Sequence, residues 1–192
     1  MFKDLSGRVL VSGAGVAGIF RVLLAVAPLL AYADSAPPAP PEVKKTVDAF
    51  AGHWTLTGTD REPGNTTAAA VNGTMDCKSA ALNAAVSCLI AADVSGSRVE
   101  AATVIGYSPD EHLVRWMEIS STGEYHDHHG RWNGNRIEFE PLTYAVAGER
   151  MTEYFSLSFV SDHQMIWKAT TKMREGESRL ELSATRAGAK AP

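Results

Sequence analysis

Two histidines separated by one residue, His126 and His128, are the side chains in this sequence best suited to chemistry. On a β-strand, residues two apart point to the same face, so the two imidazoles would lie about 7 Å apart on one side. That separation lets both reach one Zn²⁺ or Cu²⁺ ion, with Glu118 or His112 as a nearby third ligand. A metal site needs at least three convergent ligands, and the pair supplies two. We therefore interpret the pair first as the polar floor of a binding site and, in the alternative, as metal ligands. A purely structural role, with both rings hydrogen-bonded to neighbouring strands or to water, also fits the pattern.

Nucleophilic catalysis has little support in the sequence. There is no G-x-S-x-G motif, in which a strained turn exposes a catalytic serine. The two cysteines, Cys77 and Cys88, lack the C-x-x-C spacing of a redox pair. We expect them to form a disulfide, because they fall on consecutive predicted strands of a chain that is predicted to reach an oxidising compartment. No catalytic residue and no cofactor are predicted, so we expect binding rather than catalysis.

Large apolar side chains supply the volume of a hydrophobic core. Most of them would simply be buried. Some could instead line a cavity for an elongated apolar guest, since aromatic and methionine side chains suit such a wall. The sequence does not separate a filled interior from a hollow one. The candidates for a ligand-binding wall are Trp116, Trp132, Trp167 and Tyr107.

One short helix is expected before a long run of strands. Val43, Val47 and Phe50 recur at the spacing of a helix face, and Gly52 ends the pattern. We predict a helix over Glu42–Ala51.

After that helix the apolar pattern alternates with a period of two, which is typical of half-buried strands. Turn residues such as Asn133-Gly134, a strong hairpin signal, separate the runs. Short turns throughout predict an antiparallel meander that closes into an up-and-down β-barrel of about eight to ten strands. The fold class is therefore mainly β with one short N-terminal helix, and Lys78–Asn83 is expected to be a turn or a loose helical turn. The predicted strands are His53–Thr59, Thr66–Cys77, Ala85–Asp93, Arg98–Tyr107, Leu113–Ser120, Gly123–Trp132, Arg136–Glu140, Arg150–Val160, Met165–Met173 and Ser178–Arg186.

The two ends of the predicted barrel carry a family resemblance. Gly52-His53-Trp54 opens the first strand, and Arg186 closes the last one. This arrangement resembles the lipocalin-like (calycin) barrels, in which a G-x-W tryptophan packs at the closed end beneath an arginine of the final strand. A guanidinium over an indole face would contribute about 1 kcal/mol by cation–π attraction. The resemblance implies structural roles for Gly52, Trp54 and Arg186.

A second stretch is similar to bacterial families of lipocalin-like domains of unknown function. Its parts are Gly106–Tyr107, Val114–Trp116 and Gly123–Trp132, in this order along the chain. Ser108 stands where those families commonly have an aspartate. The resemblance covers roughly Phe50–Arg186 and implies an exported barrel, but it assigns no catalytic residues.

The first 33 residues are typical of a secretory signal peptide. A basic start, an apolar run over Val22–Ala31 and a small residue at Ala33 fit cleavage after Ala33. Pro28 opposes a continuous membrane-spanning helix, and an uncleaved anchor is the alternative. Residues 34–41 are proline-rich and predict an extended linker, residues 42–186 the lipocalin-like barrel domain, and residues 187–192 a disordered tail. We expect a periplasmic or secreted location, with no stable membrane insertion after cleavage.

The charge balance narrows the range of partners. A formal net charge of −4 lacks the positive field that nucleic-acid binding requires. The function that fits best is an exported barrel that binds a small apolar or amphipathic molecule in its open end. A metal-binding protein or metal-dependent enzyme centred on His126 and His128 is the first alternative. A structural or interaction protein of the envelope is the second. The sequence identifies neither the ligand nor the oligomeric state.

Overall fold

The computed structural model describes residues 38–94, 96–146 and 148–188. The predicted signal peptide, the first half of the predicted linker and the last four residues of the predicted tail lie outside the described residues. The described part contains one α-helix, one 3₁₀ turn and eleven β-strands. Among its helices, none is both long and apolar enough to span a membrane.

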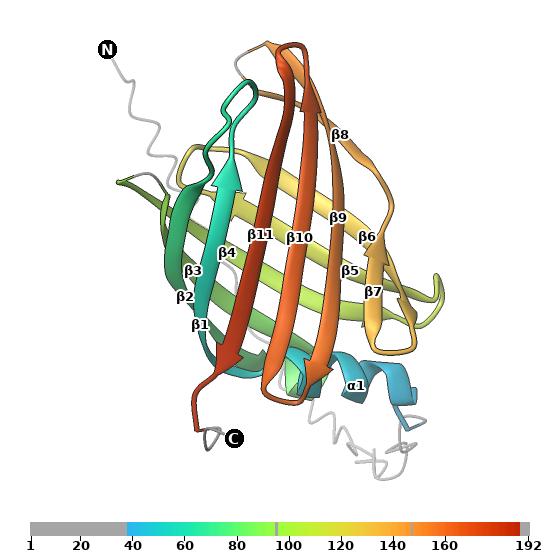
Figure 1. Cartoon of the computed structure of the whole chain (residues 1–192). Coiled ribbons are helices and arrows are strands. Elements are labelled where there is room, and N and C mark those ends of the chain that lie inside the picture. The colour runs from blue at the N-terminus through green and yellow to red at the C-terminus, as the bar shows by residue number, and fades with distance from the viewer. Residues whose placement is uncertain (1–37, 95, 147, 189–192) are drawn as a thin grey trace, which may run out of the picture. The chain divides into compact units, whose positions relative to one another are not determined.

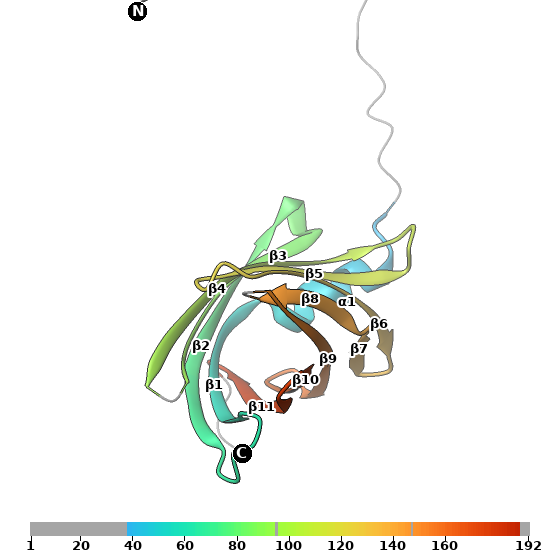
Figure 2. The same cartoon turned by 90° about the horizontal axis from the view of Figure 1, so that it is seen from above.

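The strands form one antiparallel sheet that closes on itself (Figures 1 and 2). Each strand from β1 to β7 pairs with its chain neighbour; β7 then pairs with β9, β9 with β10, β10 with β11, and β11 with β1. Among the described strands β8 pairs with β9 alone, so it is attached to the ring rather than part of it. The bounds are β1 Gly52–Arg61, β2 Ala69–Ala80, β3 Ala85–Val94, β4 Ser97–Ser108, β5 Leu113–Ser120, β6 Tyr125–Asn133, β7 Arg136–Phe139, β8 Leu142–Val146, β9 Glu149–Ser161, β10 Gln164–Met173 and β11 Gly176–Arg186.

The prediction of a mainly β, up-and-down barrel is confirmed, and each predicted strand is present. Sequence reasoning missed one strand, β8 over Leu142–Val146. This strand is five residues long, follows Pro141 and pairs along one edge, so its alternation is too short to stand out. The prediction of a turn over Lys78–Asn83 is wrong in its first half, because β2 continues to Ala80. The 3₁₀ turn then occupies Ala81–Asn83.

Helix α1 (Pro41–Phe50) covers one end of the barrel (Figure 1). A proline in the first helical turn is well tolerated, because its missing N–H would have no partner there. The helix begins and ends one residue earlier than the predicted Glu42–Ala51. We call this end of the barrel the helix end and the opposite end the open end. The buried residues of α1 are Val43, Thr46, Val47 and Phe50.

The predicted closure by Trp54 and Arg186 is found at the helix end. The two residues are opposite each other in β1 and β11, and the guanidinium carbon lies 4.5 Å from the centre of the indole ring. Trp54 Nε1 donates a hydrogen bond to the Phe50 carbonyl at 2.8 Å, and Arg186 donates to two last-turn carbonyls of α1 at 2.9 and 2.7 Å. A Cβ at Gly52, whose φ is +132°, would lie 3.3 Å from the Arg186 side chain. The G-x-W segment thus fixes helix, first strand and last strand to one another.

Aromatic side chains fill the half of the barrel near the helix end. Trp116 is 1% exposed and makes edge-to-face contacts with Phe155 and Trp167, with ring centres 5.4 and 5.2 Å apart. Phe139 stacks on Phe155 at 4.5 Å. Each such pair contributes about 0.5–1.5 kcal/mol beyond the area that it buries. We call these four residues the aromatic layer.

The predicted disulfide is present. Cys77 and Cys88 are directly opposite each other in β2 and β3, and their sulfurs are bonded. Both residues are buried on the inner face of the barrel wall. The disulfide therefore links β2 to β3 on the inner side of the barrel wall.

Candidate functional site

Strand β6 presents two chemically different faces, as its alternation predicts. His126, His128 and Trp132 point into the barrel, and His128 is only 4% exposed. Tyr125 and His129 lie on the outer face, Tyr125 being exposed. The predicted histidine pair therefore lies on the inner wall, below the rim rather than at it.

A third residue, Glu153 of β9, completes a cluster with the two histidines. Its Oε2 atom lies 3.7 Å from His126 Nδ1 and 3.7 Å from His128 Nε2. One nitrogen or oxygen atom from each of the three residues lies within 4.8 Å of the others. These separations exceed the 2.7–3.2 Å of a hydrogen bond, so the three groups face one another without bonding. We call His126, His128 and Glu153 the His–His–Glu cluster.

Each member of the His–His–Glu cluster has a polar atom without a partner. His126 Nε2, His128 Nδ1 and Glu153 Oε2 are inaccessible to solvent and make no hydrogen bond in the structure. Leaving such an atom buried and unsatisfied costs about 1–3 kcal/mol, and native proteins contain few of them. Three unpaired polar atoms in one cluster indicate a site where a bound molecule or ion supplies the missing partners.

The His–His–Glu cluster rests on the aromatic layer. The His128 ring packs against Phe155 and Phe139, with ring centres 5.2 and 5.9 Å apart. On the other side, the Tyr144 ring of β8 lies 4.3 Å from the His126 ring. Strand β8, which the sequence did not predict, thus contributes part of the wall beside the site.

Burial determines the charge of the cluster. It lowers the pKa of His128 to about 4, with the nearby His126 adding to the effect, and it also lowers the pKa of His126. Burial, followed by the repulsion of Glu118 and Glu124, raises the pKa of Glu153 to about 7. Near neutral pH both imidazoles are therefore uncharged, so the close approaches to Glu153 are not ion pairs. Neutral imidazoles keep a lone pair free for another partner.

Two more acids lie near the cluster. Glu118 is opposite His126 in the β5–β6 register, and it accepts a hydrogen bond from Trp116 Nε1 at 3.0 Å. Burial raises the pKa of Glu118, with repulsion from Glu124 adding to it. Glu124 Oε2 lies 3.8 Å from His126 Nε2. The inner wall therefore gathers three carboxyl groups around two neutral histidines.

The third residue is not one that the sequence suggested. Glu118 is close, but its carboxylate is bonded to Trp116, and His112 is exposed in the β4–β5 turn at the helix end. Glu153 lies 25 residues beyond His128 in the chain, and only the pairing of β9 brings it there. A signal existed, because Glu153 lies two residues before buried Phe155 and is the one polar residue at alternate positions from Met151 to Phe159.

The structure separates the predicted wall residues. Trp116 and Trp167 belong to the aromatic layer beneath the cluster. Trp132 lies at the helix end, where its Nε1 donates to Thr46 Oγ1 at 3.0 Å and Lys45 Nζ sits 3.9 Å from its ring centre. Tyr107 is partly buried against the core near the end of β4, also at the helix end. The expectation that Trp132 and Tyr107 share one mouth with the histidines is corrected accordingly.

Beyond the cluster, toward the open end, inward apolar side chains are only partly buried. They continue the alternation of the buried rows on β3, β4, β9 and β10. Solvent therefore reaches part of the inner wall at this end of the barrel. We call this set the apolar mouth: Val94, Val99, Met151 and Met173.

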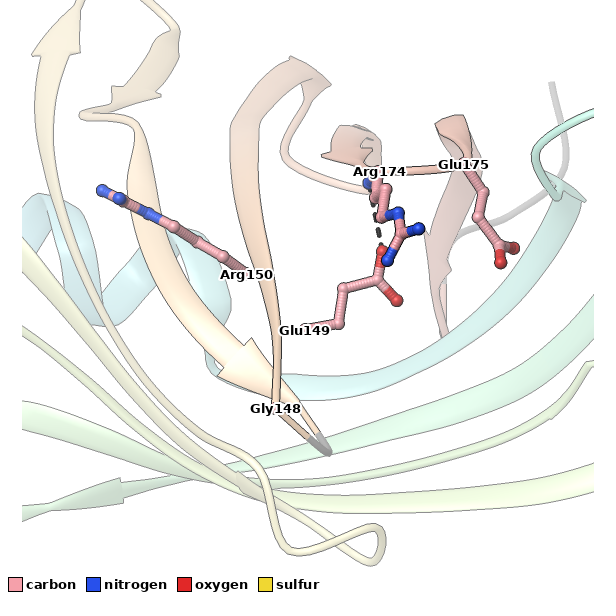
Figure 3. Close-up of a pocket in the computed structure, with 5 residues that line it drawn as sticks. All are labelled: Gly148, Glu149, Arg150, Arg174 and Glu175. Carbon is pink, nitrogen blue, oxygen red and sulfur yellow. Dashed lines mark hydrogen bonds between the residues drawn. The ribbon is translucent and has the colours of Figure 1, made fainter.

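A charged rim borders the apolar mouth. Figure 3 shows a depression between the β8–β9 and β10–β11 turns, where the Arg174 backbone N–H donates to the Glu149 carboxylate at 3.0 Å. The Arg150 side chain points away from the other three charged groups. Two acids and two bases line the depression, so the rim alone does not select the charge of a guest. The remaining lining residues are Gly148 and Glu175.

Comparison with known proteins supports the fold. No protein-family model matches the chain, and no curated protein sequence is significantly similar to it. Among solved structures, the S-type phycobiliprotein lyase CPES from Guillardia theta superposes with a TM-score of 0.54 at 10% identity, covering 75% of this chain and 92% of the lyase. The chain therefore shares the closed antiparallel β-barrel fold of the lyase. At this identity the lyase shows the shared barrel and nothing about activity.

Designed barrels also match. The redesigned barrel mFAP1 bound to DFHBI is 11% identical, with a TM-score of 0.43 over 73% of this chain and 98% of that one. A fluorescence-activating β-barrel designed de novo is 15% identical, with a TM-score of 0.41 over 73% of this chain and 96% of the designed one. The narrower resemblance to bacterial lipocalin-like domains has no sequence match behind it and stays a prediction.

Proposed function

We propose that the protein binds a small amphipathic molecule through the open end of its barrel. The molecule's apolar body would contact the apolar mouth, and its polar end would reach the His–His–Glu cluster. The observation that carries this proposal is the set of three buried, unpaired polar atoms at the foot of a partly exposed apolar wall. This function retains the sequence-based hypothesis of a small apolar or amphipathic guest and narrows it to an amphipathic one.

The apolar mouth supplies the driving force in this proposal. Each methionine or valine side chain that a guest covers contributes about 25 cal/mol per Å² of apolar surface removed from water. Met151 and Met173 are flexible and polarisable, so they adapt to guests of different shapes. The polar floor then gives orientation, because a guest that offers no polar group leaves the cluster atoms unpaired.

We further propose that the barrel acts outside the cytoplasm. The Cys77–Cys88 disulfide supports this location, since such bonds persist in oxidising compartments. Cleavage after Ala33 and the domain limits 34–41, 42–186 and 187–192 remain part of this proposal. No catalytic residue is assigned to the site.

The rival hypothesis of an envelope interaction protein has one observation in its favour. Leu89, Ile119 and Tyr125 are exposed on the outer face and lie in register across β3, β5 and β6, with Ala102 between the first two. An exposed apolar row of this kind can mark a protein contact. Nothing in the described structure shows what would cover it, so the interior site is the better-supported function.

A blocking substitution in the apolar mouth tests the proposed function. Octanoate, octylamine and octanol would be titrated into the metal-free protein in chelator and followed by calorimetry. We expect saturable binding of at least one of them. Met151→Trp should weaken that binding by about tenfold or more by filling the mouth. Met117→Trp, on the exposed outer face of β5, is the matched control and should bind like the wild type. Absence of binding to all three probes, or equal binding by the Met151→Trp variant, would contradict the proposal.

A further inference from the structure

We propose that the His–His–Glu cluster binds one divalent transition-metal ion, and that Zn²⁺ matches it best. The inference deepens the proposed function, because the ion would lie where the polar end of the guest is expected. It does not depend on any guest, so the two can be tested apart.

The donor set fits zinc. Histidine nitrogens and carboxylate oxygens are ordinary zinc ligands, and three protein ligands leave a fourth position for water or a bound molecule. The same set also accommodates other first-row ions such as Co²⁺. Both imidazoles come from β6 at alternate positions, while Glu153 comes from β9 across the inner wall. The barrel wall therefore holds all three ligands on rigid strands.

The distances fit an ion better than a hydrogen bond. With bonds of about 2.0–2.1 Å, two ligand atoms of a tetrahedral zinc ion lie about 3.3 Å apart. Glu153 Oε2 is 3.7 Å from one nitrogen of each histidine. The two Glu153 distances are therefore within a few tenths of an ångström of a coordinated geometry, and all three ligand atoms lie within 4.8 Å of one another.

Burial supports a preformed site. The side chains of His126 and Glu153 are 12% and 14% exposed, and that of His128 is 5% exposed. Glu153 Oε2, the carboxylate oxygen that faces one nitrogen of each histidine, is buried and makes no hydrogen bond. A bound ion would give this oxygen a partner and so offset the cost of burying it.

Further carboxyl groups lie around the His–His–Glu cluster, as they do around many metal sites. Glu124 lies 3.8 Å from the His126 nitrogen that faces away from Glu153. Carboxylates in that position orient metal-bound histidines by accepting the other ring N–H. Glu118 adds a third carboxyl group, and no Lys or Arg forms an ion pair with any of these three acids in the described part of the chain. A dication would offset their mutual repulsion.

The test is a titration of the full chain with ZnCl2, followed by calorimetry, and with CoCl2, followed by visible absorption. We expect one ion per chain and Co²⁺ bands typical of four-coordinate nitrogen and oxygen ligation. His126→Gln and Glu153→Gln should each weaken Zn²⁺ binding by about tenfold or more. His129→Gln, on the outer face of the same strand, is the matched control and should leave the affinity within about twofold of wild type. Circular dichroism would verify that each variant is folded.

The outcomes separate the inference from the proposed function. Failure of the folded wild-type chain to take up Zn²⁺, or an equal loss in His129→Gln, would overturn the metal site. Neither result bears on the binding of the octyl compounds in chelator, which tests whether the apolar mouth binds a guest. Loss of Zn²⁺ binding in His126→Gln and Glu153→Gln alone supports the metal site even if no octyl compound binds.

Discussion

Single residues in this barrel derive their properties from where the strands bury them. His128 would be partly charged in water near pH 6.5, but burial in the barrel wall lowers its pKa to about 4 and keeps it neutral. Glu153 shows the opposite shift, to about 7, because the same burial disfavours the carboxylate. Because its pKa is lowered, the neutral His128 keeps a ring nitrogen that can accept a bond. Because its pKa is raised, Glu153 loses its proton more readily when a cation binds beside it.

Glu118→Gln should stabilise the metal-free protein at alkaline pH. Burial raises the pKa of Glu118 in the folded state, so the wild type loses stability as pH rises through the interval above the unfolded value of about 4.3. Glutamine avoids that loss, and its carbonyl oxygen still accepts from Trp116. We expect urea denaturation in chelator to show a variant more stable than wild type at pH 8, with the difference shrinking toward pH 4.5.

Glu138→Gln, at an exposed position on β7, serves as the control for this series and should change the unfolding free energy by less than about 0.5 kcal/mol. A Glu118→Gln difference that stays constant with pH, or that grows as the pH is lowered, would refute the burial argument.

At the scale of elements, Arg186 connects α1 to both the first and the last strand of the barrel. Its guanidinium lies over Trp54 and donates two hydrogen bonds to carbonyls in the last turn of the helix. Arg186→Ala should therefore lower the free energy of unfolding by about 2–3 kcal/mol in urea denaturation. Arg179→Ala, an exposed residue of the same strand paired with Glu177, should cost less than about 0.5 kcal/mol. Equal losses in the two variants would show that the closure contributes little.

The elements were more predictable than the site. Period-two alternation and turn residues locate strands because each strand's pattern is local. A tight hairpin does join β6 to β7 at the predicted signal, with Gly134 and Asn135 as its two loop residues. Glu153 was missed because the approach of β9 to β6 depends on strand pairing far along the chain. The sequence spacing alone could have placed Trp132 correctly. It lies six residues after His126, which corresponds to about 20 Å along a strand. Sharing a face does not mean sharing a site.

At the scale of the whole molecule, hydrogen bonding between neighbouring strands closes the barrel, and one disulfide links β2 to β3. Cys77 and Cys88 are 11 residues apart in the sequence. For a loop of this length, loop-closure entropy predicts that the disulfide stabilises the fold by about 2–3 kcal/mol. Cys77→Ala/Cys88→Ala should lose about that much in urea denaturation. Added reductant should destabilise the wild type and leave the double variant unchanged. A wild-type midpoint insensitive to reductant, under conditions that verify reduction by mass, would argue against this role.

The central claim is that the inner wall around His126, His128 and Glu153 is where this barrel binds. Side-chain nitrogen NMR resolves the chain's six histidines one by one and tests that claim most directly. We predict that ZnCl2, and separately the octyl compound bound in calorimetry, shifts the ring signals of His126 and His128 and leaves those of the exposed His112 and His163 in place. Ring signals that move only at the exposed histidines, or at neither pair, would contradict the account.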